Sequence, residues 1–305
     1  MEKSEKIWID GDLVPWEEAR VHVLTHTLHY GLGVFEGIRC YRTERKGSAI
    51  FRLDEHVERL FNSAKILGIE IPFKKKEIIN AIIKVVAVNK LVECYIRPIV
   101  FLGDNKIGLN PNGVNVRVAV AAWPWGAYLG KEGLNKGIRV RISSFTGHHV
   151  NISMTRAKAC GYYINSILAK AEAVRDGYDE AILLDPNGYV SEGSGENLFL
   201  FYRGVLMTPN LSCGSLEGIT RDAVLKICKV LKVTVEEKMI TRDELYLADE
   251  IFLTGTAAEI TPVREVEGRV IGKGKRGEMT HQIQKTFFEV VQGKQSRFKK
   301  WLTSV

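Results

Sequence analysis

The amino-acid sequence predicts an α+β fold that is divided into two domains. Each half of the 305-residue chain carries several β-rich segments and amphipathic helices, which do not alternate in the regular rhythm of a βαβ protein. An aromatic segment with Pro124 and Gly126 lies near the middle of the chain and interrupts the pattern. We therefore predict a small α+β domain over residues 1–122, an interdomain loop over 123–132 and a larger, barrel-like domain over 133–305.

The first domain is defined by two helical patterns and four β-rich segments. Val57 and Leu60 begin an apolar series at helical spacing, which predicts an amphipathic helix over 54–68 with Asp54 as its N-cap. A series of isoleucines at similar spacing predicts a second helix over 75–89. The strands of this domain are predicted at 6–9, 49–53, 93–103 and 114–122.

The second domain mixes the same two kinds of element. Apolar runs at 181–184 and 198–201 predict two buried strands, and the glycine-containing segment between them predicts a short turn. The full set of strands is predicted at 138–144, 180–185, 197–202, 233–238 and 249–254. Helices are predicted at 161–176, 220–231, 242–247 and 278–292.

The composition favours a soluble protein of a reducing compartment. The chain is 45% hydrophobic and 26% charged, which is typical of a globular protein, and it has no apolar run of the roughly 18 residues that a membrane span needs. The first residues are too charged for a signal peptide. Five cysteines without a CxxC pair predict no disulfide framework. We expect a cytoplasmic protein without a membrane partner.

The net charge of +7 permits nucleic-acid binding but does not require it. The basic residues are dispersed, and their short clusters at 74–76 and 273–276 lie at the boundaries of predicted elements. They do not interleave with aromatic residues as in common RNA-binding motifs. A solvated basic surface is therefore the favoured interpretation, and its field would attract small anionic substrates.

The segment 189–200 is the most informative part of the chain. Gly193 and Gly195 allow backbone conformations and close approaches that other residues do not allow. Glu192 stands at the entrance of a predicted core strand, where a carboxylate is costly unless a positive group meets it. We interpret Glu192 as the partner of a buried cation, either a side chain or a cofactor. The alternative is a hairpin in which the glutamate is solvated.

Lys158 is a candidate nucleophile. It lies among small residues just before a largely apolar helix, and partial burial there would favour the neutral amine that attacks an aldehyde. The alternative is an ordinary lysine whose stem is covered and whose ammonium group reaches water.

Two segments have the features of anion-binding sites. Residues 218–222 open a helix, whose first N–H groups can hold a phosphate. Gly255 and Thr256 follow a core strand, and a turn of small residues there can direct several N–H groups toward one anion. Simple helix capping and a plain turn are the respective alternatives.

Tyr95 and Arg97 alternate along an apolar strand, so their side chains point to the same face. A phenol and a guanidinium on one face can receive a carboxylate, and the planar fork of arginine suits this task. The alternative is an edge strand with an exposed arginine, which Pro98 favours.

Together these features supply an imine-forming lysine, a carboxylate, phosphate sites and a carboxylate clamp, which a pyridoxal phosphate (PLP) enzyme needs. A metal site is the competing interpretation. His22, His26 and His29 would share one face of a helix, and zinc could accept two of them. Because no HExxH motif is present and the cysteines are dispersed, we predict no metal site.

On these residues the chain resembles the class IV (fold type IV) PLP-dependent aminotransferases, and most closely the branched-chain amino acid aminotransferases. The resemblance covers residues 7–291 and implies a small α/β domain followed by a larger pseudo-barrel domain. Its motifs are His29-Tyr30-Gly31, Val34-Phe35-Glu36-Gly37-Ile38-Arg39, Tyr95-Ile96-Arg97-Pro98, Pro124-Trp125-Gly126-Ala127-Tyr128, Ser191-Glu192-Gly193, Glu196-Asn197-Leu198-Phe199 and the segment from Gly255 to Pro262.

The resemblance implies a role for each matching residue. Lys158 would bond to the PLP aldehyde and, once released, act as the general base, while Glu192 would meet the pyridine nitrogen. Tyr163 would hydrogen-bond the cofactor O3′, and Arg59 would reach the phosphate. The implied cofactor-binding residues are Lys158, Glu192, Arg59, Tyr163, Leu216, Ile219, Thr220 and Thr256.

The implied substrate pocket combines aromatic walls with groups that bind carboxylates. Thr256 and Ala257 would hold the α-carboxylate with Tyr95 nearby, and Arg97 would take the distal carboxylate of glutamate. The implied substrate-binding residues are Tyr30, Phe35, Gly37, Tyr95, Arg97, Trp125, Tyr128, Thr256 and Ala257.

The implied reaction is transamination between L-leucine, L-isoleucine or L-valine and 2-oxoglutarate. A D-amino acid aminotransferase and an aminodeoxychorismate lyase share the fold and remain alternatives, although the segment 95–98 favours the branched-chain enzyme. The family also implies a homo-oligomer, with a dimer as the minimum and a hexamer as a further option, because residues 107–109 would complete a neighbouring subunit's pocket. Glu217 and Tyr162 depart from the family pattern, which often has Pro and Asn there.

Overall fold

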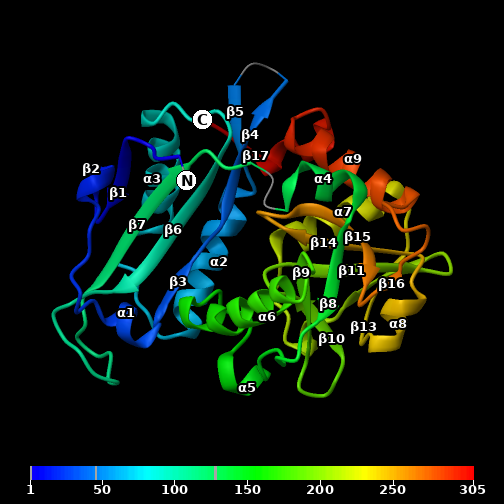
Figure 1. The fold of residues 1–305 in the computed structure, drawn as a ribbon. Helices are drawn as coiled ribbons and strands as arrows, with labels where there is room; N and C mark the ends of the chain where they lie inside the picture. Colours follow the sequence, from blue (N-terminus) through cyan, green and yellow to red (C-terminus); the bar gives the residue numbers. More distant parts are fainter. Residues whose placement is uncertain (1, 45–46, 127–128) are drawn as a thin grey trace. The chain divides into compact units, whose positions relative to one another are not determined.

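The computed structural model describes residues 2–44, 47–126 and 129–305, which form two compact units (Figure 1). The first unit comprises Met1–Gly126, Ala157–Tyr163 and Val290–Val305, and the second comprises Ala127–Arg156 and Ile164–Glu289. Each unit combines helices with a sheet, so the α+β prediction is confirmed.

The described part of the first unit contains one eight-stranded sheet in which every pairing is antiparallel. The strand order is β17-β5-β4-β6-β7-β1-β2, and β3 also pairs with β6. The strands are β1 (Lys6–Ile9), β2 (Asp12–Pro15), β3 (Gly33–Phe35), β4 (Ile38–Thr43), β5 (Gly47–Phe51), β6 (Cys94–Leu102), β7 (Val116–Trp123) and β17 (Leu302–Ser304).

Two predicted helices pack on this sheet as α2 (Leu53–Ile66) and α3 (Lys75–Val88). Their apolar series is buried in one core with the central strands, where Leu60 and Ile82 are fully covered. The predicted cap of α2 is wrong. Arg52 occupies the N-cap position in the left-handed region, and Asp54 lies in the first turn. The positive end of the helix dipole stabilises a carboxylate there.

The described part of the second unit contains a nine-stranded mixed sheet with the order β10-β9-β8-β15-β14-β11-β12-β13, and β16 pairs with β15. A hydrogen bond from Val190 N to Ile240 O joins the strand at one end of this order to the chain just after the strand at the other end. This contact brings the two ends of the strand order together, as in a barrel. The strands are β8 (Ile138–Ile142), β9 (Glu180–Leu184), β10 (Val190–Gly193), β11 (Asn197–Tyr202), β12 (Val205–Pro209), β13 (Val235–Lys238), β14 (Glu250–Gly255), β15 (Glu259–Val266) and β16 (Arg269–Val270).

The helices outside α2 and α3 differ in how well the sequence predicts them. Among the residues that the structure describes, four further predicted helices are present, and three short helices were not expected. The predicted helices are α6 (Tyr163–Arg175), α7 (Ile219–Leu231), α8 (Arg242–Leu247) and α9 (Glu278–Val291), and the unexpected ones are α1 (His26–Tyr30), α4 (Gly130–Lys136) and α5 (Val150–Ser153). None of the helices in the described ranges is long and apolar enough to cross a membrane.

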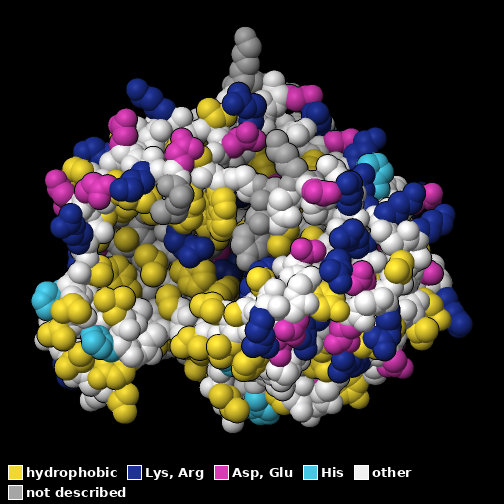
Figure 2. Space-filling model, viewed as in Figure 1, with side chains coloured by type: hydrophobic (Ala, Val, Ile, Leu, Met, Phe, Trp, Pro, Cys, Tyr) yellow, Lys and Arg dark blue, Asp and Glu magenta, His cyan; other side chains and the backbone are white. Residues whose placement is uncertain are grey.

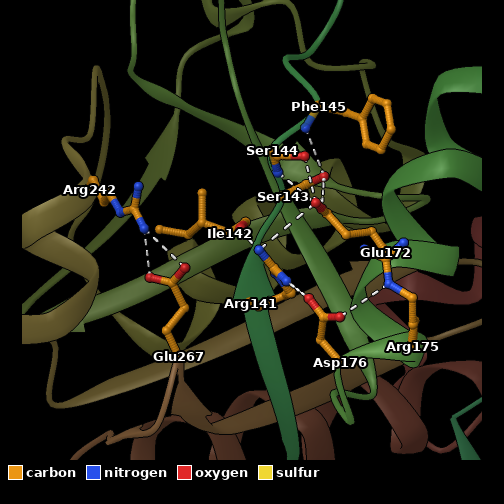
Figure 3. A network of polar contacts seen from close by, with 10 residues as sticks. All are labelled: Arg141, Ile142, Ser143, Ser144, Phe145, Glu172, Arg175, Asp176, Arg242 and Glu267. Atoms are coloured by element: carbon orange, nitrogen blue, oxygen red, sulfur yellow. Dashed lines mark hydrogen bonds and ion pairs between the residues drawn. The ribbon is translucent and has the colours of Figure 1, made fainter.

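A polar network ties α6 to the end of β8 (Figure 3). The Glu172 carboxylate accepts hydrogen bonds from Ser143 Oγ at 2.6 Å and Ser144 N at 3.0 Å. Burial disfavours its charge, but the hydrogen bonds of both serines and the Arg141 guanidinium lower the pKa of Glu172 to about 2. The charged Glu172 carboxylate therefore links α6 to the end of β8.

The units do not follow the predicted linear ranges 1–122, 123–132 and 133–305. The first unit takes in two later segments, because 157–163 lies against β3 and the C-terminal strand β17 pairs with β5. The predicted loop also differs from the structure, since β7 extends to Trp123 and α4 begins at Gly130.

Candidate active site

Lys158 is held in the first unit by backbone contacts on both sides. Its N–H donates to Ser63 Oγ at 3.0 Å, and its carbonyl accepts from Phe35 N at 3.1 Å. An isolated bridge between Val34 and Ala159 continues this pairing. The lysine is thus attached to β3 and α2 rather than to a flexible loop.

The Lys158 ammonium group lies among aromatic rings. Its Nζ is 2.6 Å from the Tyr163 hydroxyl and 5.1 Å from the centroid of the Phe35 ring. The two rings are themselves 4.9 Å apart. The side chain is partly buried, as expected for a lysine that must be directed at one atom of a ligand.

Tyr95 and Arg97 lie on the same face of β6, as predicted. Arg97 Nη2 donates to the Tyr95 hydroxyl at 3.1 Å, and its guanidinium stacks 4.6 Å from the centroid of Phe35. Arg97 Nε is buried and has no hydrogen-bond partner within the described residues. An unused, buried N–H of a cation fits a ligand carboxylate.

The edge-strand alternative for this segment is wrong, because β6 lies between β4 and β7. Pro98 is tolerated in this central strand because it faces a gap in the neighbouring ladder. The strands β3 and β4 pair with 99–101 and 94–96, and Glu36 and Gly37 lie between them. Glu36 N donates to Pro98 O at 2.9 Å, so the position requires an acceptor and not the N–H that proline lacks.

The predicted substrate residues Tyr30, Gly37 and Trp125 differ in their surroundings. The rings of Tyr95 and Trp125 lie 4.5 Å apart. Gly37 is buried against Tyr95, and a Cβ there would lie 2.0 Å from the tyrosine hydroxyl. Tyr30, at the end of α1, is 44% exposed. Tyr128 lies outside the described residues.

Arg59 of α2 forms an ion pair that the sequence did not predict. Its Nε and Nη2 donate to the two carboxylate oxygens of Glu36 at 2.7 and 3.0 Å. His56 Nδ1 lies 2.7 Å from the same carboxylate. Burial opposes the Glu36 charge, but Arg59 and His56 hold its pKa well below the usual range, whereas burial lowers the pKa of His56. The group is thus an ionised Glu36 that bonds to the Arg59 guanidinium and to the His56 ring.

Glu192 lies in the second unit, on β10 rather than in the predicted turn. Its Oε2 accepts from Leu216 N at 3.0 Å and from Asn197 Nδ2 at 3.2 Å. The same Asn197 amide donates to Leu216 O at 2.9 Å. Asn197 therefore orients the carboxylate, a role that its polar side chain at the start of an apolar strand could have suggested.

The start of α7 adjoins this carboxylate. Gly218 is the N-cap residue without a side-chain cap bond, and Ile219 and the buried Thr220 begin the helix. A Cβ on Gly218 would lie 1.8 Å from Asn197 Oδ1, so glycine is required for this close approach.

Further polar groups of the second unit complete the donor set. Thr256 and Ala257 lie in the turn between β14 and β15. The Ser215 and Thr254 hydroxyls are buried and have no hydrogen-bond partner among the residues that the structure describes. Buried hydroxyls without a protein partner can bond to a water molecule or to a ligand.

The histidines of the alternative zinc site are engaged elsewhere. His26 Nε2 lies 2.8 Å from Gly108 O, and His29 Nε2 lies 2.9 Å from Val23 O. His22 precedes α1 and does not share its face. Within the described ranges no group of three histidines, cysteines or acidic residues has metal-binding geometry.

Glu196 is a buried carboxyl group in a cluster of acids. Its Oε2 accepts from Gly195 N at 3.1 Å. Burial and the neighbouring Glu180 charge raise the pKa of Glu196 to about 8, with a further contribution from Glu192, against the opposing effects of Gly195 N–H and Lys170. At neutral pH Glu196 is therefore mostly protonated.

We predict that Glu196→Gln stabilises the protein increasingly as pH rises. A raised acid pKa means that the folded state binds more protons than the unfolded state between pH 4.5 and 8, so wild-type stability falls across this window. Glutamine keeps an acceptor for Gly195 N. We expect no difference below pH 4.5 and roughly 2–5 kcal/mol at pH 8, measured by denaturant titration of the apoprotein.

Glu172→Gln is the matched control with the opposite sign. The pKa of the wild-type Glu172 is lowered to about 2. The charge of Glu172 therefore stabilises the fold above pH 4.5, and this stabilisation is lost as pH falls through 2. Equal pH profiles for Glu196→Gln and wild type would contradict the assignment of a protonated Glu196.

The chain is similar in sequence to known aminotransferases. A family model described as amino-transferase class IV matches residues 33–266. The branched-chain-amino-acid aminotransferase of Pseudomonas aeruginosa is 55% identical over 299 residues, which are 98% of this chain and 97% of that protein.

Solved structures are similar over the whole chain. The crystal structure of the Escherichia coli branched-chain amino acid aminotransferase has a TM-score of 0.96 and 48% identity, covering 98% of this chain and 99% of the other. The T.th. enzyme of the same name with pyridoxamine 5′-phosphate has a TM-score of 0.96 and 50% identity over 99% of each chain. Its complexes with N-(5′-phosphopyridoxyl)-L-glutamate and 4-methylvaleric acid both have TM-scores of 0.95 at 49% and 48% identity over 99% of each chain.

Proposed function

Because this chain belongs to the class IV aminotransferase family, we propose that it uses PLP to exchange amino groups between branched-chain L-amino acids and 2-oxoglutarate. The observation that carries the proposal is the Lys158 amine, 2.6 Å from the Tyr163 hydroxyl and bordered by Phe35. A lysine held by backbone bonds beside a phenol and aromatic rings has the surroundings that a covalently held aldehyde cofactor needs.

The donor set fits PLP. Glu192 is an oriented carboxylate for a protonated ring nitrogen, and α7 begins with N–H groups that suit a phosphate. Bound PLP supplies an aldehyde that bonds to amines and a ring that accepts the electrons released at the substrate Cα. The proposed cofactor contacts are Lys158, Tyr163, Arg59, Glu192, Leu216, Ile219, Thr220 and Thr256.

The side chains of this protein divide the work of the reaction. Lys158 moves the proton at the substrate Cα, and the Tyr163 hydroxyl fixes the position of the amine that does so. Arg97 binds the distal carboxylate of glutamate through the buried edge whose Nε has no partner within the described structure. Phe35 and Trp125 offer an apolar surface to leucine, isoleucine or valine.

The substrate assignment draws support from the relatives. A complex with phosphopyridoxyl-L-glutamate and one with 4-methylvaleric acid, which has the leucine carbon skeleton, exist for the same T.th. protein. An aromatic pocket with one arginine can accept both a branched alkyl group and a carboxylate. Thr256, Ala257 and Tyr95 are the proposed groups for the α-carboxylate, and Tyr30, Gly37 and Tyr128 belong to the same proposed pocket.

The absorbance spectrum tests the proposal. We expect purified protein with PLP to show a visible cofactor band that changes on adding L-leucine and returns with 2-oxoglutarate. A band that ignores L-leucine but responds to D-alanine would indicate a D-amino acid aminotransferase. Release of pyruvate from aminodeoxychorismate would indicate the lyase, and the absence of any band would overturn the cofactor assignment.

We predict that Gly37→Ala weakens substrate binding. The new Cβ would lie 2.0 Å from the Tyr95 hydroxyl and would separate it from Arg97. We expect KM for 2-oxoglutarate to rise about tenfold, as for the loss of one charged hydrogen bond, and stability to fall by about 1–3 kcal/mol from overpacking. Gly126→Ala is the control, because its Cβ meets no atom within 4 Å. An unchanged KM would contradict the role of Gly37.

The oligomer is also a proposal. Leu109 is 87% exposed and Val23 72% exposed, and His26 Nε2 ties the loop 103–115 to α1 through Gly108 O. Hydrophobic side chains gather on the surface over α1 and over α5 and α6 (Figure 2). Exposed apolar patches of this kind mark association surfaces. We expect a dimer or a multiple of it in sedimentation, and a fully active monomer would contradict this. A cytoplasmic location stays a prediction.

A further inference from the structure

Glu36 is a fully buried acid of the first unit that links the end of β3 to α2. It follows β3 directly after Phe35, and its carboxylate bonds to two side chains of α2. Gly37 N also donates to Glu36 Oε2, at 3.2 Å. A carboxylate with this many partners is locked in position.

Stability alone does not explain this group. A buried ion pair can often be replaced by apolar residues of similar size at no cost, because desolvation offsets the attraction between the charges. A buried acid between two strands is therefore expected to serve the placement of a neighbour. The three members differ in exposure: Glu36 is fully covered and His56 is 1% exposed, whereas Arg59 is 13% exposed. Arg59 is therefore the member whose side chain reaches the surface.

We propose that Glu36 is a positioning residue that fixes the Arg59 guanidinium for the phosphate group of the bound cofactor. This inference rests on the proposed function, in which Arg59 contacts that phosphate. Two hydrogen bonds from Nε and Nη2 set both the place and the plane of the guanidinium. Arginine binds phosphate through this plane, so its orientation decides how many donors the anion receives.

The proposal is testable because net charge and orientation predict opposite effects of removing Glu36 on phosphate binding. The Glu36 carboxylate cancels the Arg59 charge, so its removal would strengthen phosphate binding if net charge were decisive. If orientation is decisive, its removal weakens binding of a phosphate-bearing ligand and leaves a ligand without phosphate unaffected.

The experiment compares PLP with pyridoxal, which lacks the phosphate. Dissociation constants of both are measured on the apoprotein by fluorescence quenching for wild type and Glu36→Gln. We expect the variant to bind PLP at least about tenfold more weakly, as for the loss of one charge-assisted hydrogen bond, and pyridoxal within twofold of wild type. Arg59→Gln should lose the same preference, and the double variant no more than either single variant.

Two further variants separate positioning from folding. Glu36→Asp keeps the charge but withdraws it by one methylene group, and we expect a partial loss of the preference for PLP. His56→Asn keeps a donor to Glu36 without touching Arg59, and we expect the wild-type preference.

Each contrary result has a distinct meaning. Unchanged or tighter PLP binding by both Glu36 variants would overturn the proposal, as would equal losses for PLP and pyridoxal. A wild-type protein that binds neither ligand would overturn the proposed function and this inference together. If the wild type prefers PLP and the Glu36 variants keep this preference, this inference alone is overturned.

Discussion

Replacing Lys158 with alanine is expected to abolish transamination. The amine is the proposed point of cofactor attachment and the group that moves the Cα proton, so one substitution removes two functions. We expect kcat to fall by at least about 10³-fold. The measurement is single-turnover conversion of L-leucine by PLP-loaded protein, with borohydride treatment and peptide mapping to locate the cofactor mass at residue 158 in wild type.

The control for this variant is Lys84→Ala. Lys84 is an exposed lysine of α3 in the same unit, and we expect wild-type turnover from it. Folding of Lys158→Ala should persist, because Phe35 and Ser63 contact the backbone of residue 158. Appreciable turnover by Lys158→Ala, with the cofactor mass at another lysine, would contradict the assignment.

Replacing Glu192 with glutamine is expected to have the second-largest effect. Glutamine retains an oxygen that can accept from Leu216 N and Asn197 Nδ2, so the local structure should persist while the negative charge is lost. Without that charge the cofactor's ring nitrogen would lose the counterion proposed for it. We expect kcat to fall by about 10²–10³-fold, as for the removal of one preorganised electrostatic group.

The matched control is Glu236→Gln, at an exposed position of β13 in the same unit. Apoprotein melting temperatures should agree among wild type and both variants. Wild-type kcat for Glu192→Gln, measured at saturating PLP and substrate, would remove this residue from the proposed mechanism.

The candidate site residues could be named from the sequence more readily than the residues that bond to them. Lys158, Glu192 and the Tyr95–Arg97 pair stand out because each is a polar residue in an apolar context whose charge needs an explanation. Asn197 and Glu36 have the same signal, but their partners are distant in sequence. Nothing in the local pattern shows that Asn197 bonds to Leu216, or that Glu36 lies within reach of α2.

The long helices were predicted well, whereas several strands, including the eight-residue β15, were not. The helices α2, α3 and α7 span 13 or 14 residues, enough for a helical period to repeat. The strands β3 and β10 have three and four residues, too few for alternation to be visible. Pro98 shows a further limit: the rule that proline marks an edge strand fails where the adjoining ladder is interrupted by Glu36 and Gly37.

The return of the chain to the first unit has a consequence for biosynthesis. The strand β17 pairs with β5, and the segment 157–163 lies against β3. A ribosome must therefore have made residues 302–304 before the first sheet can be completed, although most of that sheet emerges early. Until then this edge of β5 is unpaired, and an unpaired strand edge can associate with other chains. Because these pairings are so distant in sequence, slow refolding is expected for the isolated protein.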